Sequence, residues 1–157
     1  MTGIDTGHLR RAIAIARRSR AKGNHPFGAL LVDAAGAVVA EAENTVTSDH
    51  DPTGHAEINL VRAAVRRFDS DYLAGCTLYS STEPCTMCSG AIYWAGLGHV
   101  VYALGEDELR RMTGSNPANP TLALPIREVF ARGQRVVSVQ GPALLEEARA
   151  VHDGFWE

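Results

Sequence analysis

Two short motifs contain the residue types that proteins use to bind transition metals: His55-Ala56-Glu57, and Pro84-Cys85-Thr86-Met87-Cys88 further along the chain. Cys85 and Cys88 are three residues apart, so both sulfurs lie on the same side of a first helical turn. The unpaired N–H groups and positive dipole end of a helix start lower the pKa of thiols there and favour thiolates. One imidazole and two such thiolates form a soft donor set that suits Zn²⁺.

The same residues leave a position free for chemistry at the metal. Three protein ligands, His55, Cys85 and Cys88, leave the fourth position of a tetrahedral zinc site open for water. Two thiolates neutralise the ion, so it acidifies water less than an ion held by three imidazoles, and a nearby base is needed. Glu57 lies two residues after His55 and is the candidate base. We therefore predict one Zn²⁺ per chain, with Glu57 as the catalytic acid/base.

Two other functions can be built from Cys85 and Cys88: a structural zinc site and a redox pair. A structural site would need a fourth Cys or His, and the sequence has none near either motif. A redox pair would give no role to His55-Ala56-Glu57. His50 competes with His55 as the imidazole ligand, but it lacks a Glu two places on.

Hydrophobic periodicity and helix-boundary residues predict the elements that must hold these motifs. Helices are expected over residues 6–22, from Pro52-Thr53 to about 68, and over 85–95, 106–112, 124–131 and 142–152. Strands are expected over 27–32, 38–42, 76–80, 99–104 and 135–139, the first two forming a hairpin. This order predicts an α/β fold, a three-layer α/β/α sandwich in which helices cover both faces of a five-stranded mixed sheet.

The composition favours a single domain over residues 1–157. The chain has 157 residues, 45% of them hydrophobic, which is enough for a core, and it shows no repeat or low-complexity linker. Lys and Arg number 15 against 18 Asp and Glu, and this net charge of −3 does not predict a polyanion-binding protein. Arginines crowd the first helix, and we interpret them as a solvated helix face in preference to a phosphate-binding one.

The sequence predicts neither a membrane protein nor a secreted one. Its apolar runs are far shorter than the roughly 18 residues needed to span a bilayer, and its first residues do not resemble a signal peptide. Three cysteines without such a signal argue against a disulfide framework, so Cys76 is expected to be a small buried apolar residue. We expect a cytoplasmic protein with no membrane partner.

The combined motifs resemble the cytidine/deoxycytidylate deaminase superfamily, and within it the bacterial guanine deaminase and nucleoside deaminase branch. The likeness is carried by Asn44 and by three stretches, His-Pro-Phe-Gly-Ala at 25–29, Asp-Pro-Thr-Gly-His-Ala-Glu at 51–57, and Glu-Pro-Cys-Thr-Met-Cys-Ser-Gly-Ala-Ile-Tyr-Trp-Ala at 83–95. The resemblance implies a cytidine deaminase-like fold, hydrolytic deamination at the zinc with Glu57 moving the protons, and a homodimer.

The resemblance also implies a set of substrate contacts. These are Asn44 through its amide, Ala56 and Glu83 through the backbone around them, and Phe27 and Trp94 as walls of the pocket. An amide both donates and accepts hydrogen bonds, which suits a ring that carries N–H and C=O groups. A turn-capping role for Asn44, and ordinary core packing for the two aromatic residues, are the structural alternatives.

The segment of about 142–157 ends in two large aromatic residues, Phe155 and Trp156, which must dock instead of remaining in water. In guanine deaminase-like proteins a C-terminal aromatic segment closes the active site, sometimes by exchange between subunits, and the resemblance implies this role here. Glu146 and Glu147 are candidates to accept hydrogen bonds from the N1–H and amino groups of guanine. An acidic helix start explains these two residues equally well.

The expected reaction is hydrolytic deamination of a free aminopurine-type nucleobase, guanine to xanthine plus ammonia, with water as co-substrate. The alternatives are a tRNA adenosine deaminase, a cytosine or nucleoside deaminase, and an aminotriazine deaminase. A tRNA enzyme needs Lys and Arg to neutralise phosphates. The negative net charge and the aromatic tail therefore argue against nucleic acid as a partner.

Overall fold

A computed structural model describes residues 3–157 and contains an open five-stranded sheet with strand order β2-β1-β3-β4-β5. Its strands are β1 (Gly28–Val32), β2 (Val38–Glu43), β3 (Thr77–Thr82), β4 (His99–Leu104) and β5 (Ser138–Gln140). Strand β1 is antiparallel to β2 and to β3, whereas β3, β4 and β5 run parallel. The mixed sheet and the hairpin of the first two strands are confirmed.

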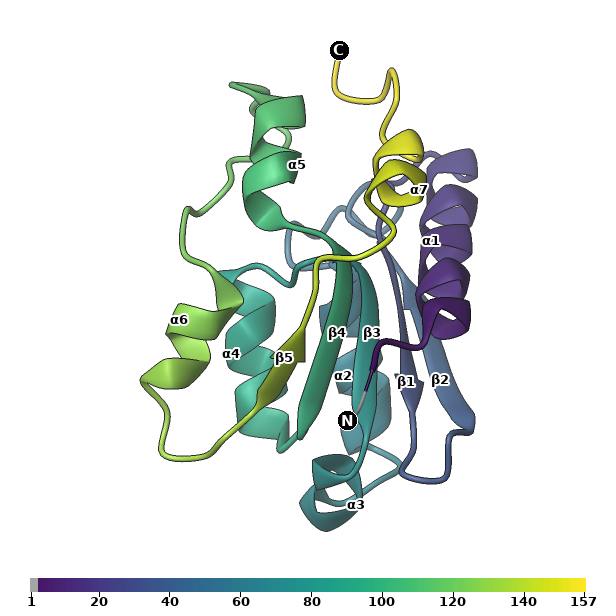
Figure 1. Cartoon of the computed structure of the whole chain (residues 1–157). Helices are drawn as coiled ribbons and strands as arrows, with labels where there is room; N and C mark the ends of the chain where they lie inside the picture. Colours follow the sequence, from purple (N-terminus) through teal and green to yellow (C-terminus); the bar gives the residue numbers. More distant parts are fainter. Residues whose placement is uncertain (1–2) are drawn as a thin grey trace.

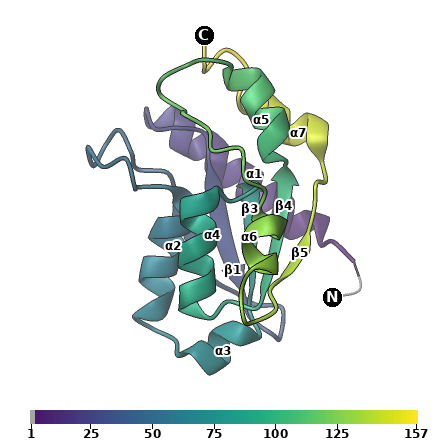
Figure 2. The same ribbon diagram turned by 90° about the vertical axis from the view of Figure 1, so that its left-hand side faces the viewer.

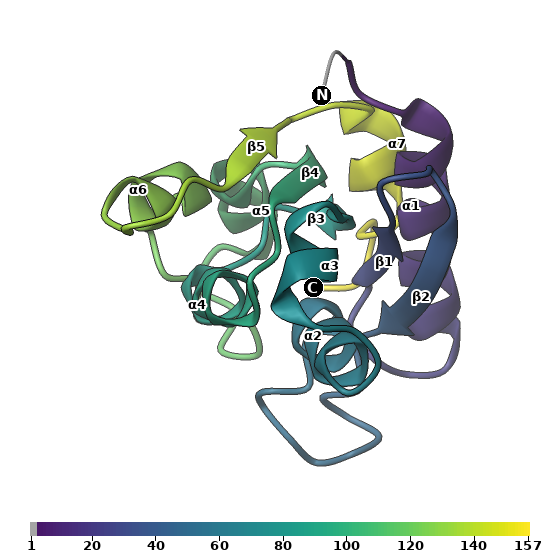
Figure 3. The ribbon, with the colours of Figure 1, turned by 90° about the horizontal axis from the view of Figure 1, so that it is seen from below.

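Helices cover both faces of this sheet (Figures 1 and 3). They are α1 (Thr6–Ala21), α2 (Ala56–Val65), α3 (Ser70–Ala74), α4 (Thr86–Ala95), α5 (Glu106–Thr113), α6 (Ile126–Ala131) and α7 (Leu145–Ala150). One face carries α1 and α7, and the other carries α2, α4 and α6. The predicted three-layer α/β/α sandwich is therefore confirmed, although α3 was not expected.

The core is divided by the sheet, and alternate residues of β1 belong to opposite halves. Leu30 packs with Leu9 and Ile13 of α1, whereas Leu31 packs with Leu60 of α2 and Ile92 of α4. All five residues of β1 are buried, as expected for a strand covered on both faces. Cys76 is fully buried in the second half, as predicted. This packing fixes α2 and α4 side by side on one face (Figure 2).

The expected start of α2 at Pro52-Thr53 is wrong. The Asp51 carboxylate accepts hydrogen bonds from the Thr53 N–H at 2.9 Å and the Thr53 hydroxyl at 2.7 Å, and the Gly54 N–H donates to the Asp51 carbonyl at 3.0 Å. Asp side chains favour such turns over helices. The helix consequently begins at Ala56, and His55 becomes its N-cap residue.

The last strand and the last helix are shorter than predicted. Strand β5 covers Ser138–Gln140 in place of 135–139, because Arg135 bonds to backbone carbonyls of α4 and of the turn after it. Helix α7 covers Leu145–Ala150 in place of 142–152. Over residues 3–157, no helix is both long and apolar enough to cross a membrane.

Candidate active site

The imidazole and the two thiols meet where α2 and α4 begin. His55 is the N-cap of α2, Cys85 is the N-cap of α4, and Cys88 lies in the first turn of α4. His55 Nδ1 lies 3.5 Å from Cys85 Sγ and 3.5 Å from Cys88 Sγ, and the three donor atoms lie within 4.8 Å of one another. Ordinary Zn–N and Zn–S bonds at a tetrahedral angle require an N···S distance of ~3.6 Å. These residues therefore fit a zinc ion.

The two thiols hold one proton between them. A hydrogen bond from Cys88 lowers the pKa of Cys85 to about 4, and the bond with His55 also favours the Cys85 thiolate. The same bond to Cys85, together with burial, raises the pKa of Cys88 well above its usual value. A bound cation displaces such a proton because thiolates are the metal ligands. Cys88 has no solvent exposure, so its sulfur lies buried beside His55.

Glu57 lies in the first turn of α2 and is only 6% exposed. Burial raises the pKa of its carboxyl to about 7, and the nearby imidazole of His55 partly opposes this. A carboxyl with a pKa near neutrality can both take and return a proton, which a general acid/base must do. The structure thus places Glu57 against the metal-binding residues with the acidity its predicted role needs.

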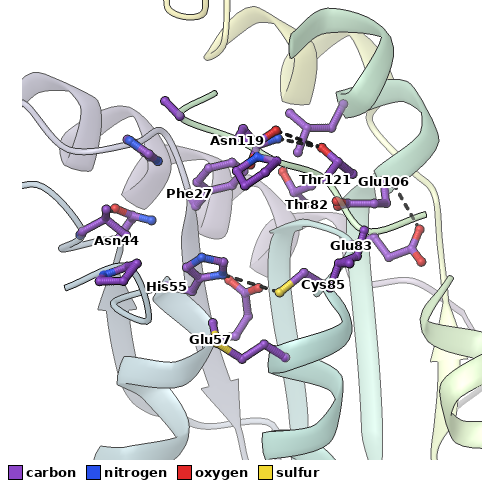
Figure 4. Close-up of a pocket in the computed structure, with 18 of the residues that line it drawn as sticks. Phe27, Asn44, His55, Glu57, Thr82, Glu83, Cys85, Glu106, Asn119 and Thr121 are labelled. Carbon is purple, nitrogen blue, oxygen red and sulfur yellow. Dashed lines mark hydrogen bonds between the residues drawn. The ribbon is translucent and has the colours of Figure 1, made fainter. Parts of the chain in front are cut away.

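A cavity of about 390 Å³ opens above these residues. We call His55, Glu57, Cys85 and Cys88 the metal floor. The other side chains around the cavity form the substrate wall, whose main members are Phe27, Asn44, Glu106 and residues 117–122. Figure 4 shows Asn44 and Glu106 on opposite sides of the metal floor.

Asn44 and Phe27 line the cavity, as the resemblance implied. Asn44 is 1% exposed, and its Oδ1 accepts a hydrogen bond from the Val46 N–H at 3.0 Å. This bond is the turn-capping role, and it fixes the amide so that its NH₂ group remains available as a donor. Both interpretations of Asn44 are therefore compatible in one orientation.

The side chain of Glu83 has a structural role that the sequence did not reveal. Its Oε1 accepts a hydrogen bond from the Glu106 N–H at 3.1 Å, and its Oε2 accepts one from the Ile126 N–H at 2.8 Å. The carboxylate thus caps the starts of α5 and α6. Glu83 remains a cavity residue through its position, directly before Pro84 and Cys85.

Glu106 is a cavity residue that sequence analysis missed. It is the first residue of α5, directly after β4, and the run of acidic residues there hid it because such runs favour any helix start. Burial raises the pKa of its carboxyl to about 8, and the nearby Cys85, Glu83 and Glu57 act in the same direction. The available signal was its place after the carboxyl end of a parallel strand, where ligands bind in open α/β sheets.

The C-terminal aromatic residues pack behind the substrate wall and do not line the cavity. The Trp156 ring lies 5.3 Å from the His25 ring and 6.1 Å from the Phe27 ring, centroid to centroid, and both of these residues do line it. Trp156 Nε1 donates to His152 Nδ1 at 3.0 Å, and the Trp156 carbonyl accepts from Asn116 Nδ2 at 2.7 Å. The tail therefore supports two parts of the wall, and Phe155 and Trp156 do not line the cavity within this chain. Their contact with substrate stays a prediction.

Three other expected substrate contacts also lie away from the cavity. Trp94 is 88% exposed on the outer surface of α4, because the apolar stripe of that helix does not include it. Glu147 forms an ion pair with Arg10 of α1 at 3.0 Å, and the neighbouring Glu146 is exposed. All three residues face the outside of this chain, so the expectation that they line its cavity is wrong.

Comparison with known proteins agrees with this geometry. The family model for the cytidine and deoxycytidylate deaminase zinc-binding region matches residues 3–104. A probable cytosine deaminase of Schizosaccharomyces pombe is 38% identical over 153 residues, covering 98% of this chain and 93% of that protein. Guanine deaminase of Bacillus subtilis is 46% identical over 96 residues, and this chain spans 61% of its length.

Solved structures resemble the fold as well. The X-ray structure of the Bacillus subtilis guanine deaminase superposes with a TM-score of 0.63 at 39% identity, covering 69% of each chain. A mutant of NE0047 in complex with 8-azaguanine gives a TM-score of 0.75 at 25% identity, covering 92% of this chain and 79% of that one. Together with the family match over the metal floor, these likenesses mean that the chain belongs to the cytidine and deoxycytidylate deaminase zinc-binding family, a family of hydrolytic deaminases.

Proposed function

We propose that this chain deaminates a free nucleobase of the aminopurine type, with guanine as the first substrate to test and xanthine and ammonia as its products. The observation that carries the proposal is the position of the buried Glu57 carboxyl beside His55, Cys85 and Cys88 at the floor of a cavity. A cavity of about 390 Å³ lies near the lower end of the range for small-ligand pockets and suits a flat base.

The residues around the cavity have different roles in this reaction. His55, Cys85 and Cys88 would hold a zinc ion, which would supply the Lewis acidity that makes water nucleophilic near neutral pH. Glu57 takes a proton from the attacking water and passes it to a ring nitrogen. It then moves the proton of the new hydroxyl group to the amino group, which leaves as ammonia as the carbonyl forms. The amide of Asn44 donates a hydrogen bond to an acceptor on the ring, and Phe27 excludes water from one side.

The surface charges of α1 support a small substrate over tRNA. Arg10 pairs with Glu147, Arg11 pairs with Glu41, and Glu43 holds both Arg18 and Lys22. Basic side chains that are already paired release fewer counterions on binding a phosphate backbone. Four basic residues of this segment thus have carboxylate partners within the same chain, whereas Arg20 donates to the Val151 carbonyl.

Cytosine is the second candidate substrate. The specific observation in its favour is the coverage of the Schizosaccharomyces pombe relative, which extends over nearly the whole of both chains. The similarity to the Bacillus subtilis guanine deaminase covers only 60% of this chain. The homodimer implied by the resemblance stays a prediction.

The test is ammonia release by the zinc-loaded protein from guanine, adenine, cytosine, their nucleosides, an aminotriazine and a tRNA anticodon stem-loop. We expect guanine to have the highest kcat/KM, and Glu57→Gln serves as the inactive control with the metal retained. A higher kcat/KM for cytosine than for guanine would make cytosine, the second candidate, the proposed substrate. Preference for the stem-loop, or no release from any free base, would overturn the proposal.

A further inference from the structure

The cavity has two polar sides that come from distant parts of the sheet. Asn44 follows β2, whereas Glu106 follows β4, and in the strand order β1 and β3 lie between these two strands. Three strand spacings of about 4.8 Å separate the two positions. Both residues nevertheless line the same cavity, on opposite sides of the metal floor (Figure 4). A ligand that contacts both of them must extend across the cavity.

The backbone of Glu106 is held in place while its carboxyl remains unpaired. Its N–H donates to Glu83 Oε1 at 3.1 Å, which fixes the first turn of α5 next to the residue that precedes Pro84 and Cys85. No hydrogen bond or ion pair engages the Glu106 carboxyl oxygens within residues 3–157. A half-buried carboxyl without a partner offers a ready acceptor, and it keeps an oxygen lone pair in either protonation state.

The chemistry of the two sides is complementary. Asn44 has its Oδ1 occupied by Val46 and presents an N–H donor, whereas Glu106 presents an acceptor. Guanine placed with its amino-bearing carbon over the metal floor has its C6 carbonyl on one flank. Its N9–H lies on the other flank, next to the ring fusion and beyond N3. With the carbonyl at Asn44, the N9–H points to the side of the cavity that holds Glu106.

We propose that Glu106 determines specificity for the free base over the nucleoside, by accepting a hydrogen bond from the ring N–H that carries the sugar in nucleosides. This inference rests on the proposed function. In a nucleoside that nitrogen has no hydrogen, so the carboxyl of Glu106 loses its donor and meets a sugar in its place. A site built to pair with an N–H rejects the analogue that lacks it, because its own polar group is then left buried and unpaired.

The test compares guanine with 9-methylguanine, and any other accepted base with its methyl derivative at the sugar-bearing nitrogen. In the wild type, kcat/KM for the free base should exceed that for the methyl derivative. We expect Glu106→Ala to reduce this ratio about 10- to 100-fold, the cost of leaving one polar group in the site without its hydrogen-bond partner. Glu106→Gln keeps the volume and should give an intermediate ratio. Zinc content and melting temperature of both variants should match the wild type.

Asp107→Ala is the matched control, because it removes the neighbouring carboxylate of the same helix start outside the catalytic cavity. In this variant, the ratio of kcat/KM for the free base to kcat/KM for its methyl derivative should stay within about twofold of the wild-type ratio. The inference is overturned if Glu106→Ala and Glu106→Gln change kcat/KM for the free base and kcat/KM for its methyl derivative by the same factor. It is also overturned if these substitutions change the kcat/KM ratio of guanine to 1-methylguanine but leave the ratio of guanine to 9-methylguanine unchanged. Either result leaves the proposed function standing, whereas a wild type without activity on any free base refutes the proposed function itself.

Discussion

The metal floor and the substrate wall differ in how the chain builds them. Each member of the metal floor lies at the start of α2 or α4, and two short motifs supply all of them. The substrate wall collects Phe27, Asn44, Glu106 and residues 117–122 from separate segments, and the tail supports it from behind. The metal-binding residues can thus be recognised from local sequence spacing, whereas the residues that contact substrate are brought together only by the tertiary fold.

The largest effect should come from removing a ligand of the metal floor. Cys88→Ala takes away a fully buried sulfur that lies 3.5 Å from His55 Nδ1, so we expect loss of zinc, of activity and of folding stability. Elemental analysis and thermal unfolding measure this. Cys76→Ala is the matched control, since it removes another fully buried thiol outside the cluster and should keep the zinc. Stoichiometric zinc in Cys88→Ala would contradict the ligand assignment.

Glu57→Gln separates proton transfer from metal binding within the metal floor. The amide keeps the size of the side chain but cannot exchange a proton, so we expect kcat to fall by about 10²–10⁴ with zinc retained. In the wild type, kcat/KM should rise with pH as the Glu57 carboxyl ionises, since burial raises its pKa to about 7. A variant that retains wild-type turnover would remove Glu57 from the mechanism.

The support behind the substrate wall should depend on pH through His152. Burial lowers the pKa of this imidazole to about 4, below its unfolded value near 6.5, and Nδ1 must stay unprotonated to accept from Trp156. The unfolded chain therefore binds more protons between these values, and stability falls as the pH is lowered from 6.5 to 4. The full loss is about 3 kcal/mol at 1.36 kcal/mol per pKa unit.

Thermal unfolding of the wild type and of His152→Gln over this pH range tests the prediction. Glutamine can accept from the Trp156 N–H but cannot gain a proton, so the variant should lose this part of the pH dependence. Zinc content should be followed in parallel, because release of the metal by acid would also lower stability. Parallel pH profiles for the two proteins at equal zinc content would refute the role of His152.

The smallest effect is expected at a residue that the resemblance placed in the pocket and the structure does not. Glu147 is paired with Arg10 on the surface, and such exposed pairs contribute about 0–1 kcal/mol. Glu147→Gln should therefore change kcat/KM by less than about twofold. Steady-state kinetics with the preferred base measure this. A large rise in KM would mean that Glu147 reaches substrate after all.

The sequence predicted the sheet, its helical layers and the metal floor because these rest on local signals. The helix expected over 85–95 illustrates this, since α4 ends at Ala95 and Gly96 follows it at a φ of 89°. The start of α2 was misplaced because Pro52-Thr53 resembles a helix start while Asp51 forms a turn there. The place of Glu106 in the cavity was not predicted, because it depends on the tertiary fold. The capping role of the Glu83 side chain was not predicted either, because its partners are backbone N–H groups far along the chain.

The carboxylate of Glu83 links the metal floor to the substrate wall. Glu83 directly precedes Pro84 and Cys85, yet its two oxygens hold the first N–H groups of α5 and α6. Loss of this carboxylate would leave both helix starts without their acceptor, so a single side chain joins the Cys85 segment to the part of the substrate wall that carries Glu106.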